Sequence, residues 1–238
     1  MKKLFFIFSI LFATTVYGQE IKVLLVTGGH GFDTPSFFQL FDALDGIRYT
    51  AVQQPEANRM IARGEAASFD VLVFYDMWKT ISEEEKKGYL RLLDAGKPFL
   101  FMHHALVSYQ NWPEFEKIVG GRYVEKEKEQ PLPTAELSTY RHDVWVDIQV
   151  VDPKHPVTAG FSGFRLFDEV YGNYRVGAQV VPLLQTNHPE STPVIAWENR
   201  YRNARIVFLQ PGHDANAYND VNYRKLVRQA IRYLAGKK

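Results

Sequence analysis

The stretch I-K-V-L-L-V-T, from Ile21 to Thr27, decides the fold of this chain. Its nearly continuous run of isoleucine, valine and leucine is typical of a strand that is buried on both faces of a parallel sheet. The residues G-G-H-G follow, and a helix is then predicted with Thr34 as its N-cap and Pro35 as its first residue. A buried strand followed directly by a helix is the repeating unit of an α/β fold.

The alternation of strands and helices continues through the first half of the chain. Strand, helix, strand, helix and strand are predicted in this order over residues 49–53, 56–63, 71–75, 82–95 and 98–102. Ser82 and Glu85 form a capping box at the start of the longer helix, and Gly96 ends it. Because strands joined through helices run parallel, we expect a doubly wound, mostly parallel sheet with helices on both faces.

The second half of the chain has a different pattern. The charged run E-K-E-K-E over 125–129 predicts a solvated loop, and the alternation from His142 to Val150 predicts a half-exposed strand. Two strands, a hairpin turn, a further strand and a last helix are predicted over 179–184, 193–197, 199–204, 205–209 and 220–234. No repeat or linker marks a second domain, so we expect a single domain over 19–238.

The first 18 residues have the features of a cleaved secretory signal peptide. Two lysines precede an apolar stretch from Leu4 to Val16 that is short for a membrane span, and small residues stand where a signal peptidase would cut. An uncleaved anchor is the alternative. We expect a periplasmic or secreted protein that starts at Gln19 and is not held at a membrane after cleavage.

Composition narrows the function further. The chain has 28 basic and 27 acidic residues and a net charge of +1, which argues against a nucleic-acid partner. It has no cysteine, so disulfide bonds and thiolate chemistry are excluded. The sequence leaves open whether copies of the chain form a homo-oligomer.

Three histidine-bearing loops are predicted at the same edge of the sheet, where ligands bind in doubly wound folds. The loops are G-G-H-G-F-D with His30 and Asp33, M-H-H-A with His103 and His104, and P-G-H-D with His213 and Asp214. Tyr75 and Asp76 follow the third strand and are predicted at this edge too. A lone histidine is more often structural, but three such loops together predict a binding or active site.

Adjacent residues of a strand point to opposite faces, so His103 and His104 can face one site only if a sharp turn begins there. We expect His104 to point into the pocket and His103 to support it. Glu169, in L-F-D-E-V-Y, is a candidate general base or ligand, with an exposed acidic turn as the alternative. Tyr171 is predicted on the rim, where an aromatic ring suits the face of a sugar.

Histidine and carboxylate side chains are also the usual ligands of zinc, and a catalytic zinc ion keeps one position open. The candidate ligands for such a divalent metal are His30, His104 and His213. There is no H-E-x-x-H motif, so a site would be assembled from distant loops. The remaining histidines are interpreted as surface, loop or turn residues, namely His142, His155 and His188.

Several of these segments together resemble the ThuA-like (trehalose utilisation) family. The matching segments are V-T-G-G-H-G-F-D, F-M-H-H-A-L, D-P-K-H-P-V-T-A-G-F, D-E-V-Y and P-V-I-A-W-E-N with R-I-V-F-L-Q-P-G-H-D. The resemblance covers residues 21–234 and implies a flavodoxin-like fold of the class I glutamine-amidotransferase type. True amidotransferases place a cysteine at a turn after a central strand, with a late histidine beside it. In this chain that turn reads His103-His104, the late histidine corresponds to His213, and the absence of cysteine excludes glutaminase chemistry.

The resemblance also implies a role in sugar catabolism that passes through 3-keto intermediates. A 3-keto group acidifies the neighbouring C–H bond, and histidine is suited to proton transfer near neutral pH. The first hypothesis is an enzyme that cleaves, hydrates or isomerises a keto-glycoside, with His104 and His213 as acid and base and His30 or a metal ion beside the enolate oxygen. The second is a non-catalytic protein that binds a small carbohydrate in the same pocket.

Overall fold

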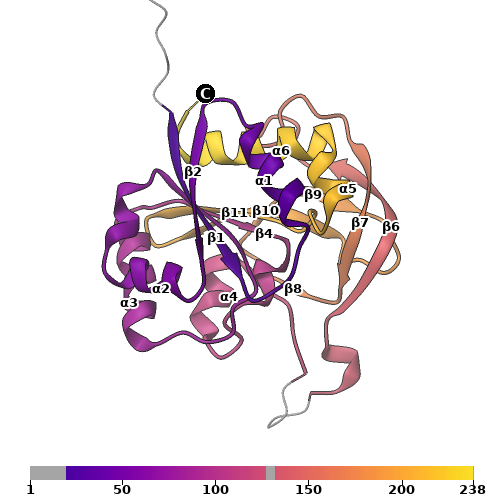
Figure 1. Ribbon diagram of the computed structural model, residues 1–238. Helices are drawn as coiled ribbons and strands as arrows, with labels where there is room; N and C mark the ends of the chain where they lie inside the picture. Colours follow the sequence, from indigo (N-terminus) through magenta and orange to yellow (C-terminus); the bar gives the residue numbers. More distant parts are fainter. Residues whose placement is uncertain (1–19, 127–131, 238) are drawn as a thin grey trace, which may run out of the picture.

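A nine-stranded sheet forms the centre of the computed structural model, which describes residues 20–126 and 132–237 (Figure 1). Its strand order is β2-β1-β3-β4-β11-β10-β9-β6-β7. The first five strands are parallel, and the other four continue the sheet in antiparallel pairs. The order of the parallel strands is that of flavodoxin-like folds. The predicted doubly wound α/β fold is therefore confirmed.

The parallel half contains five of the predicted strands. They are β1 (Ile21–Gly28), β2 (Ile47–Gln53), β3 (Val71–Asp76), β4 (Phe99–Met102) and β11 (Ala204–Leu209). Every residue of β3 and β4 is buried, as expected for strands covered on both faces. The antiparallel half consists of β6 (Thr139–Val150), β7 (Phe164–Gly172), β9 (Val181–Thr186) and β10 (Val194–Tyr201). Two short strands, β5 (Gly121–Arg122) and β8 (Arg175–Val176), pair separately.

Helices cover both faces of this sheet (Figure 1). One core lies under α1 (Thr34–Asp42), α5 (Ala215–Asn219) and α6 (Val221–Leu234), and the other under α2 (Glu56–Ala62), α3 (Glu83–Asp94) and α4 (Pro113–Val119). Trp197 is fully buried in the second core, and its indole N–H donates to the Val119 carbonyl at 2.8 Å.

Two predictions concern membranes: the signal peptide, and the absence of a membrane anchor after its cleavage. Over 20–126 and 132–237, no helix combines the length and the apolar character needed to cross a bilayer. The predicted signal peptide, residues 1–18, lies outside the described residues.

The N-cap of α1 differs from the prediction. The cap is Asp33, whose carboxylate accepts a hydrogen bond from the Ser36 N–H at 2.9 Å, and Thr34 is the first helical residue. Thr34 was wrong as the N-cap because aspartate caps at least as well as threonine and stands one residue earlier. In the same way Asp214 caps α5, a five-residue helix that was not predicted, by accepting from the Asn216 N–H at 2.8 Å.

The predicted late hairpin is formed by β10 and β11. Tyr201 pairs with Ala204, so the turn consists only of Arg202 and Asn203 and is shorter than the predicted 199–204. Arg202 has a φ of 53°, which lets the chain reverse within two residues.

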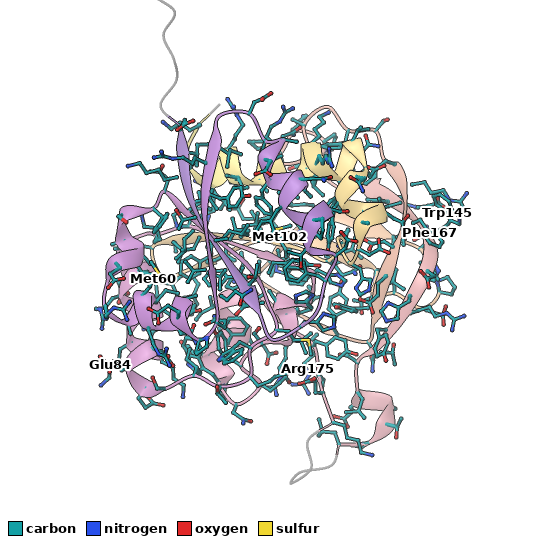
Figure 2. The ribbon with its side chains drawn as sticks, in the orientation of Figure 1. Met60, Glu84, Met102, Trp145, Phe167 and Arg175 are labelled. Carbon is teal, nitrogen blue, oxygen red and sulfur yellow. The ribbon has the colours of Figure 1, made fainter. Side chains whose placement is uncertain are left out.

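The outer strand β6 carries the exposed aromatic side chain of Trp145 (Figure 2). Trp145 is 55% exposed, and its ring lies 5.2 Å from that of Phe167 and 5.0 Å from the guanidinium carbon of Arg165. Arg165 in turn contacts Asp147 at 3.4 Å. Charged side chains at this edge disfavour pairing with another chain.

The predicted capping box of α3 is present. Ser82 Oγ accepts from the Glu85 N–H at 3.3 Å, and Glu85 Oε2 accepts from the Ser82 N–H at 2.7 Å. Replacing Ser82 with alanine should lower the free energy of unfolding by about 1 kcal/mol, and replacing it with glycine by only a few tenths. Urea unfolding measures both values. No loss in either variant would show that the hydroxyl does not stabilise this helix.

Candidate functional site

A sharp turn at the end of β4 delivers two histidines to the carboxyl edge of the sheet. His103 has a φ of 49°, in the left-handed region that residues other than glycine seldom adopt, and it opens a 3₁₀ turn over His103–Val107. A sharp turn at this point was required for both histidines to face the same side. The structure contains that turn. Both side chains are buried.

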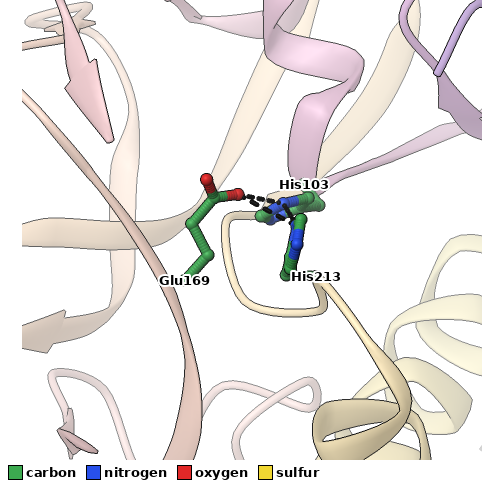
Figure 3. A group of neighbouring side chains, drawn as sticks. All are labelled: His103, Glu169 and His213. Carbon is green, nitrogen blue, oxygen red and sulfur yellow. Dashed lines mark hydrogen bonds and ion pairs between the residues drawn. The ribbon is translucent and has the colours of Figure 1, made fainter. Parts of the chain in front are cut away.

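The His103 ring lies at the centre of a polar cluster (Figure 3). Its Nδ1 lies 2.7 Å from the Gln210 carbonyl, which can only accept, so Nδ1 carries a proton and Nε2 is the nitrogen that faces the cluster. Nε2 lies 2.8 Å from Glu169 Oε2, 3.1 Å from His213 Nδ1 and 3.0 Å from the Tyr171 hydroxyl. Three groups from distant parts of the chain thus converge on one nitrogen.

Glu169 is a buried residue within β7, and the alternative of an exposed acidic turn is wrong. Besides its contact with His103, Oε2 lies 3.1 Å from His213 Nδ1, and Oε1 lies 3.4 Å from His142 Nδ1. Burial by itself would raise the pKa of Glu169, but the neighbouring imidazoles of His103 and His213 outweigh it and hold the pKa well below its ordinary value. The carboxylate therefore stays ionised at neutral pH.

The loop that carries His213 is held by the neighbouring residue of β7. Asp168 accepts from the backbone N–H groups of Gly212 and His213 at 2.7 and 2.9 Å. Desolvation by itself would lower the pKa of His213, but the contact with the Glu169 carboxylate outweighs it and raises the pKa above its ordinary value. Asp168 fixes where the imidazole is presented, since both of its contacts are to this loop.

His104 does not point into the pocket as predicted. It is 1% exposed, its Nε2 lies 3.4 Å from the Tyr75 carbonyl, and its ring packs 4.8 Å from that of His30. Desolvation, with the nearby His103, holds the pKa of His104 well below its ordinary value. The left-handed turn aims the ring of His103 across the sheet toward Glu169 of β7, and neither of the two adjacent histidines lines the pocket.

A pocket of about 280 Å³ opens beside this cluster. Its lining combines titratable groups, three tyrosines and two apolar side chains, namely His30, Met77, Val107, Tyr123, Glu125, Tyr140, His142, Glu169 and Tyr171. The Nδ1 atom of His30 donates to the Gly31 carbonyl at 2.6 Å, which leaves Nε2 as the basic nitrogen. Desolvation lowers the pKa of His30, so the ring is neutral near pH 7.

His142 is exposed, in agreement with the surface position expected for it, but it lies on β6 and is part of the site. Its ring lies 4.6 Å from that of His213, and it lines the pocket. Glu125 was also assigned to a solvated run, yet it lines the pocket and pairs with Lys79 at 2.6 Å. Both residues were missed because they join the site only through the packing of strands and loops that are far apart in the sequence. The local sequence pattern does not show which of these segments are neighbours.

Four predicted site residues lie away from the pocket. Tyr75 and Asp76 are buried inside β3; the Tyr75 hydroxyl donates to the Gly212 carbonyl at 2.9 Å, and Asp76 accepts from Gln54 Nε2 at 2.9 Å. Asp33 and Asp214 cap helices. All four were predicted in the site from the position of their loops, but their side chains have structural partners.

Five of the seven histidines therefore gather at one edge of the sheet, namely His30, His103, His104, His142 and His213. His155 lies elsewhere and contacts Glu198 at 2.9 Å, in agreement with the structural role predicted for it. Such a density of titratable groups around one pocket is typical of a functional site.

Comparison with known structures shows the same fold in other proteins. A ThuA-like protein from Parabacteroides merdae has a TM-score of 0.73 at 20% identity, and the match covers 92% of this chain and 91% of that one. A ThuA-like protein from Bacteroides uniformis has a TM-score of 0.69 at 18% identity, with 92% and 93% covered. A glutamine amidotransferase from Thermotoga maritima has a TM-score of 0.51 at 10% identity, with 92% and 99% covered.

Sequence comparison adds the family. No curated protein matches this chain. The family model described as ThuA, trehalose utilisation, matches residues 22–234. This range includes every residue of the cluster and of the pocket, and it confirms the resemblance found in the sequence motifs. The chain belongs to the ThuA (trehalose utilisation) family.

Proposed function

We propose that the pocket binds a small carbohydrate carrying a keto group and that the surrounding side chains move protons on it. The observation that carries this proposal is the convergence of His30, His142 and Glu169 on a pocket that three tyrosines also line. Aromatic rings suit the apolar faces of sugars, and the polar groups suit their hydroxyls. The family's association with trehalose utilisation supports a sugar as the ligand class.

The proposed reaction begins with removal of a proton next to the ketone. In a 3-keto glycoside, His30 Nε2 takes the C2 proton, and the electron pair of the C–H bond moves to give an enolate on the C3 oxygen. The enolate then reforms the ketone, a double bond forms between C1 and C2 as the C1–O bond breaks, and the leaving oxygen takes a proton from solvent. The polar cluster of His103, His213 and Glu169 lies beside the pocket, where a positive charge held by it would stabilise the enolate oxygen.

The assignment of the base follows from the tautomer of His30. Its Nδ1–H is used by the Gly31 carbonyl, so Nε2 is the nitrogen available to accept a proton. His104, predicted from the sequence to act with His213 as acid and base, packs behind His30 and lines no part of the pocket. Its role in this proposal is to support the His30 ring.

The test is an NMR time course in D₂O with a 3-keto disaccharide and, in a second tube, its parent sugar. We expect the keto sugar alone to be consumed and its C2 proton to exchange with solvent. His30→Gln should lose both reactions, and His188→Gln, which lies outside the pocket, should retain them. Line broadening of a sugar without conversion or exchange would contradict the enzyme and favour a carbohydrate-binding protein.

A further inference from the structure

We propose that His103 Nε2, His213 Nδ1 and Glu169 Oε2 together bind one divalent first-row transition-metal ion. These three atoms come from the turn after β4, the loop after β11 and the interior of β7 (Figure 3). The ligand set differs from the zinc site expected from the sequence, since of those candidates only His213 takes part. The site does not depend on the identity of the substrate, so the inference goes beyond the proposed function.

The three donor atoms form a nearly equilateral triangle. The distances are 2.8 Å from His103 Nε2 to Glu169 Oε2, 3.1 Å from His103 Nε2 to His213 Nδ1, and 3.1 Å from His213 Nδ1 to Glu169 Oε2. An ion at about 2.0–2.2 Å from each atom fits above this triangle, and sides of this length subtend angles of about 90° at it. Three donors at such angles occupy one face of an ion and leave its other face open.

The hydrogen bonding of His103 decides which of its nitrogens belongs to the cluster. Its Nδ1 lies 2.7 Å from the Gln210 carbonyl, so Nε2 is the nitrogen that faces Glu169 Oε2, at 2.8 Å. A proton can link one pair of the three atoms, whereas a metal ion contacts all three at once.

The donor atoms are also held in place by groups that do not themselves face the ion. The Gln210 carbonyl fixes the His103 ring, and Gln210 Nε2 donates to the Glu169 carbonyl at 3.0 Å. Asp168 fixes the backbone of His213. Outer contacts of this kind set the tautomer and orientation of histidine ligands in metal sites.

The chemistry of the donors indicates the class of metal. Two imidazole nitrogens and one carboxylate oxygen suit Zn²⁺, Mn²⁺, Fe²⁺ and Co²⁺, while the absence of sulfur from the set disfavours Cu(I). An open face toward the pocket would let the ion meet a sugar oxygen. Such an ion would supply the positive charge that the proposed reaction requires at the enolate.

A second buried histidine–glutamate pair in the same chain provides the control. His155 Nε2 lies 2.9 Å from Glu198 Oε2, nearly the same separation as in the cluster. Its further neighbours are the Tyr233 hydroxyl and the guanidinium groups of Arg200 and Arg205. Without a second imidazole, and with cations beside the carboxylate, this pair does not form a metal site.

The experiment is a titration of chelator-treated protein with Co²⁺, followed by visible absorption, together with equilibrium dialysis against Zn²⁺ and against Mn²⁺. We expect one ion per chain. Glu169→Gln and His213→Asn should weaken binding by more than about 100-fold, beyond the loss caused by removing an outer contact, and Glu198→Gln should leave it unchanged. Circular dichroism checks that each variant is folded.

Two results would overturn this proposal: the absence of one-to-one binding by any of the three ions, or binding that Glu169→Gln and His213→Asn leave intact. Turnover of the keto sugar by metal-free protein would leave the proposed reaction standing without the ion. Metal binding without turnover would support the metal site and contradict the proposed reaction. The two proposals can therefore fail separately.

Discussion

Glu169→Gln should lower the rate of 3-keto glycoside conversion by about 10²–10⁴-fold, the range typical of a group that supports proton transfer. Glutamine keeps the size of the side chain but carries no negative charge, so the cluster with His103 and His213 can no longer hold a cation beside the pocket. Initial rates measured by NMR at saturating substrate report this loss. Metal content, measured in parallel, shows whether the ion is lost with the charge.

The matched control is Glu198→Gln, which makes the same change in the buried pair with His155. We expect it to keep the rate of the unmodified protein. Glu169→Asp, which restores the charge on a shorter side chain, should recover part of the activity. A folded Glu169→Gln protein with an unchanged rate would show that the Glu169 carboxylate takes no part in the reaction.

The stability of the protein should depend on pH through Asp76. This side chain is 1% exposed, and burial, only partly offset by the hydrogen bond from Gln54, raises its pKa to about 7. In the unfolded chain its pKa is about 4. The folded state therefore binds the proton more tightly, and the stabilisation is complete below pH 4 and is lost as the pH rises to about 7. The loss amounts to about 4 kcal/mol, an order-of-magnitude value.

Asp76→Asn removes this titration and should flatten the pH dependence. The amide oxygen can still accept from Gln54, so the variant should match the unmodified protein near pH 4 and exceed it in stability at pH 8. Urea unfolding at several pH values measures the difference. Asp45→Asn, at an exposed position, serves as the control. Parallel curves for Asp76→Asn and the unmodified protein would contradict a protonated carboxyl in the core.

The parallel half of the sheet was predictable because each of its strands is marked locally. The runs from Ile21 to Thr27 and from Val71 to Tyr75 are apolar because both faces are covered, and capping residues such as Ser82 mark the helices between strands. The antiparallel half was predicted only as separate strands. Its order depends on β6 lying between β9 and β7, which is a contact between segments far apart in the sequence.

The site was predictable to the extent that it follows the strand-end rule. That rule placed His30, His103 and His213 at one edge, and the structure brings their rings together. It had no means of placing His142, near the start of β6, because the rule concerns parallel strands. The rule also does not distinguish a side chain that binds a ligand from one that caps a helix. Asp33 was therefore grouped with the histidines, although its carboxylate caps α1.

At the left-handed turn of His103, the backbone determines where the side chain lies, and the residue type determines its chemistry. In this chain the turn presents an imidazole to a carboxylate and to a second histidine. The place of this side chain is set by the backbone, through the φ of residue 103 and the buried strand before it. For protein engineering, residue 103 is therefore the position at which to try a different reactive group.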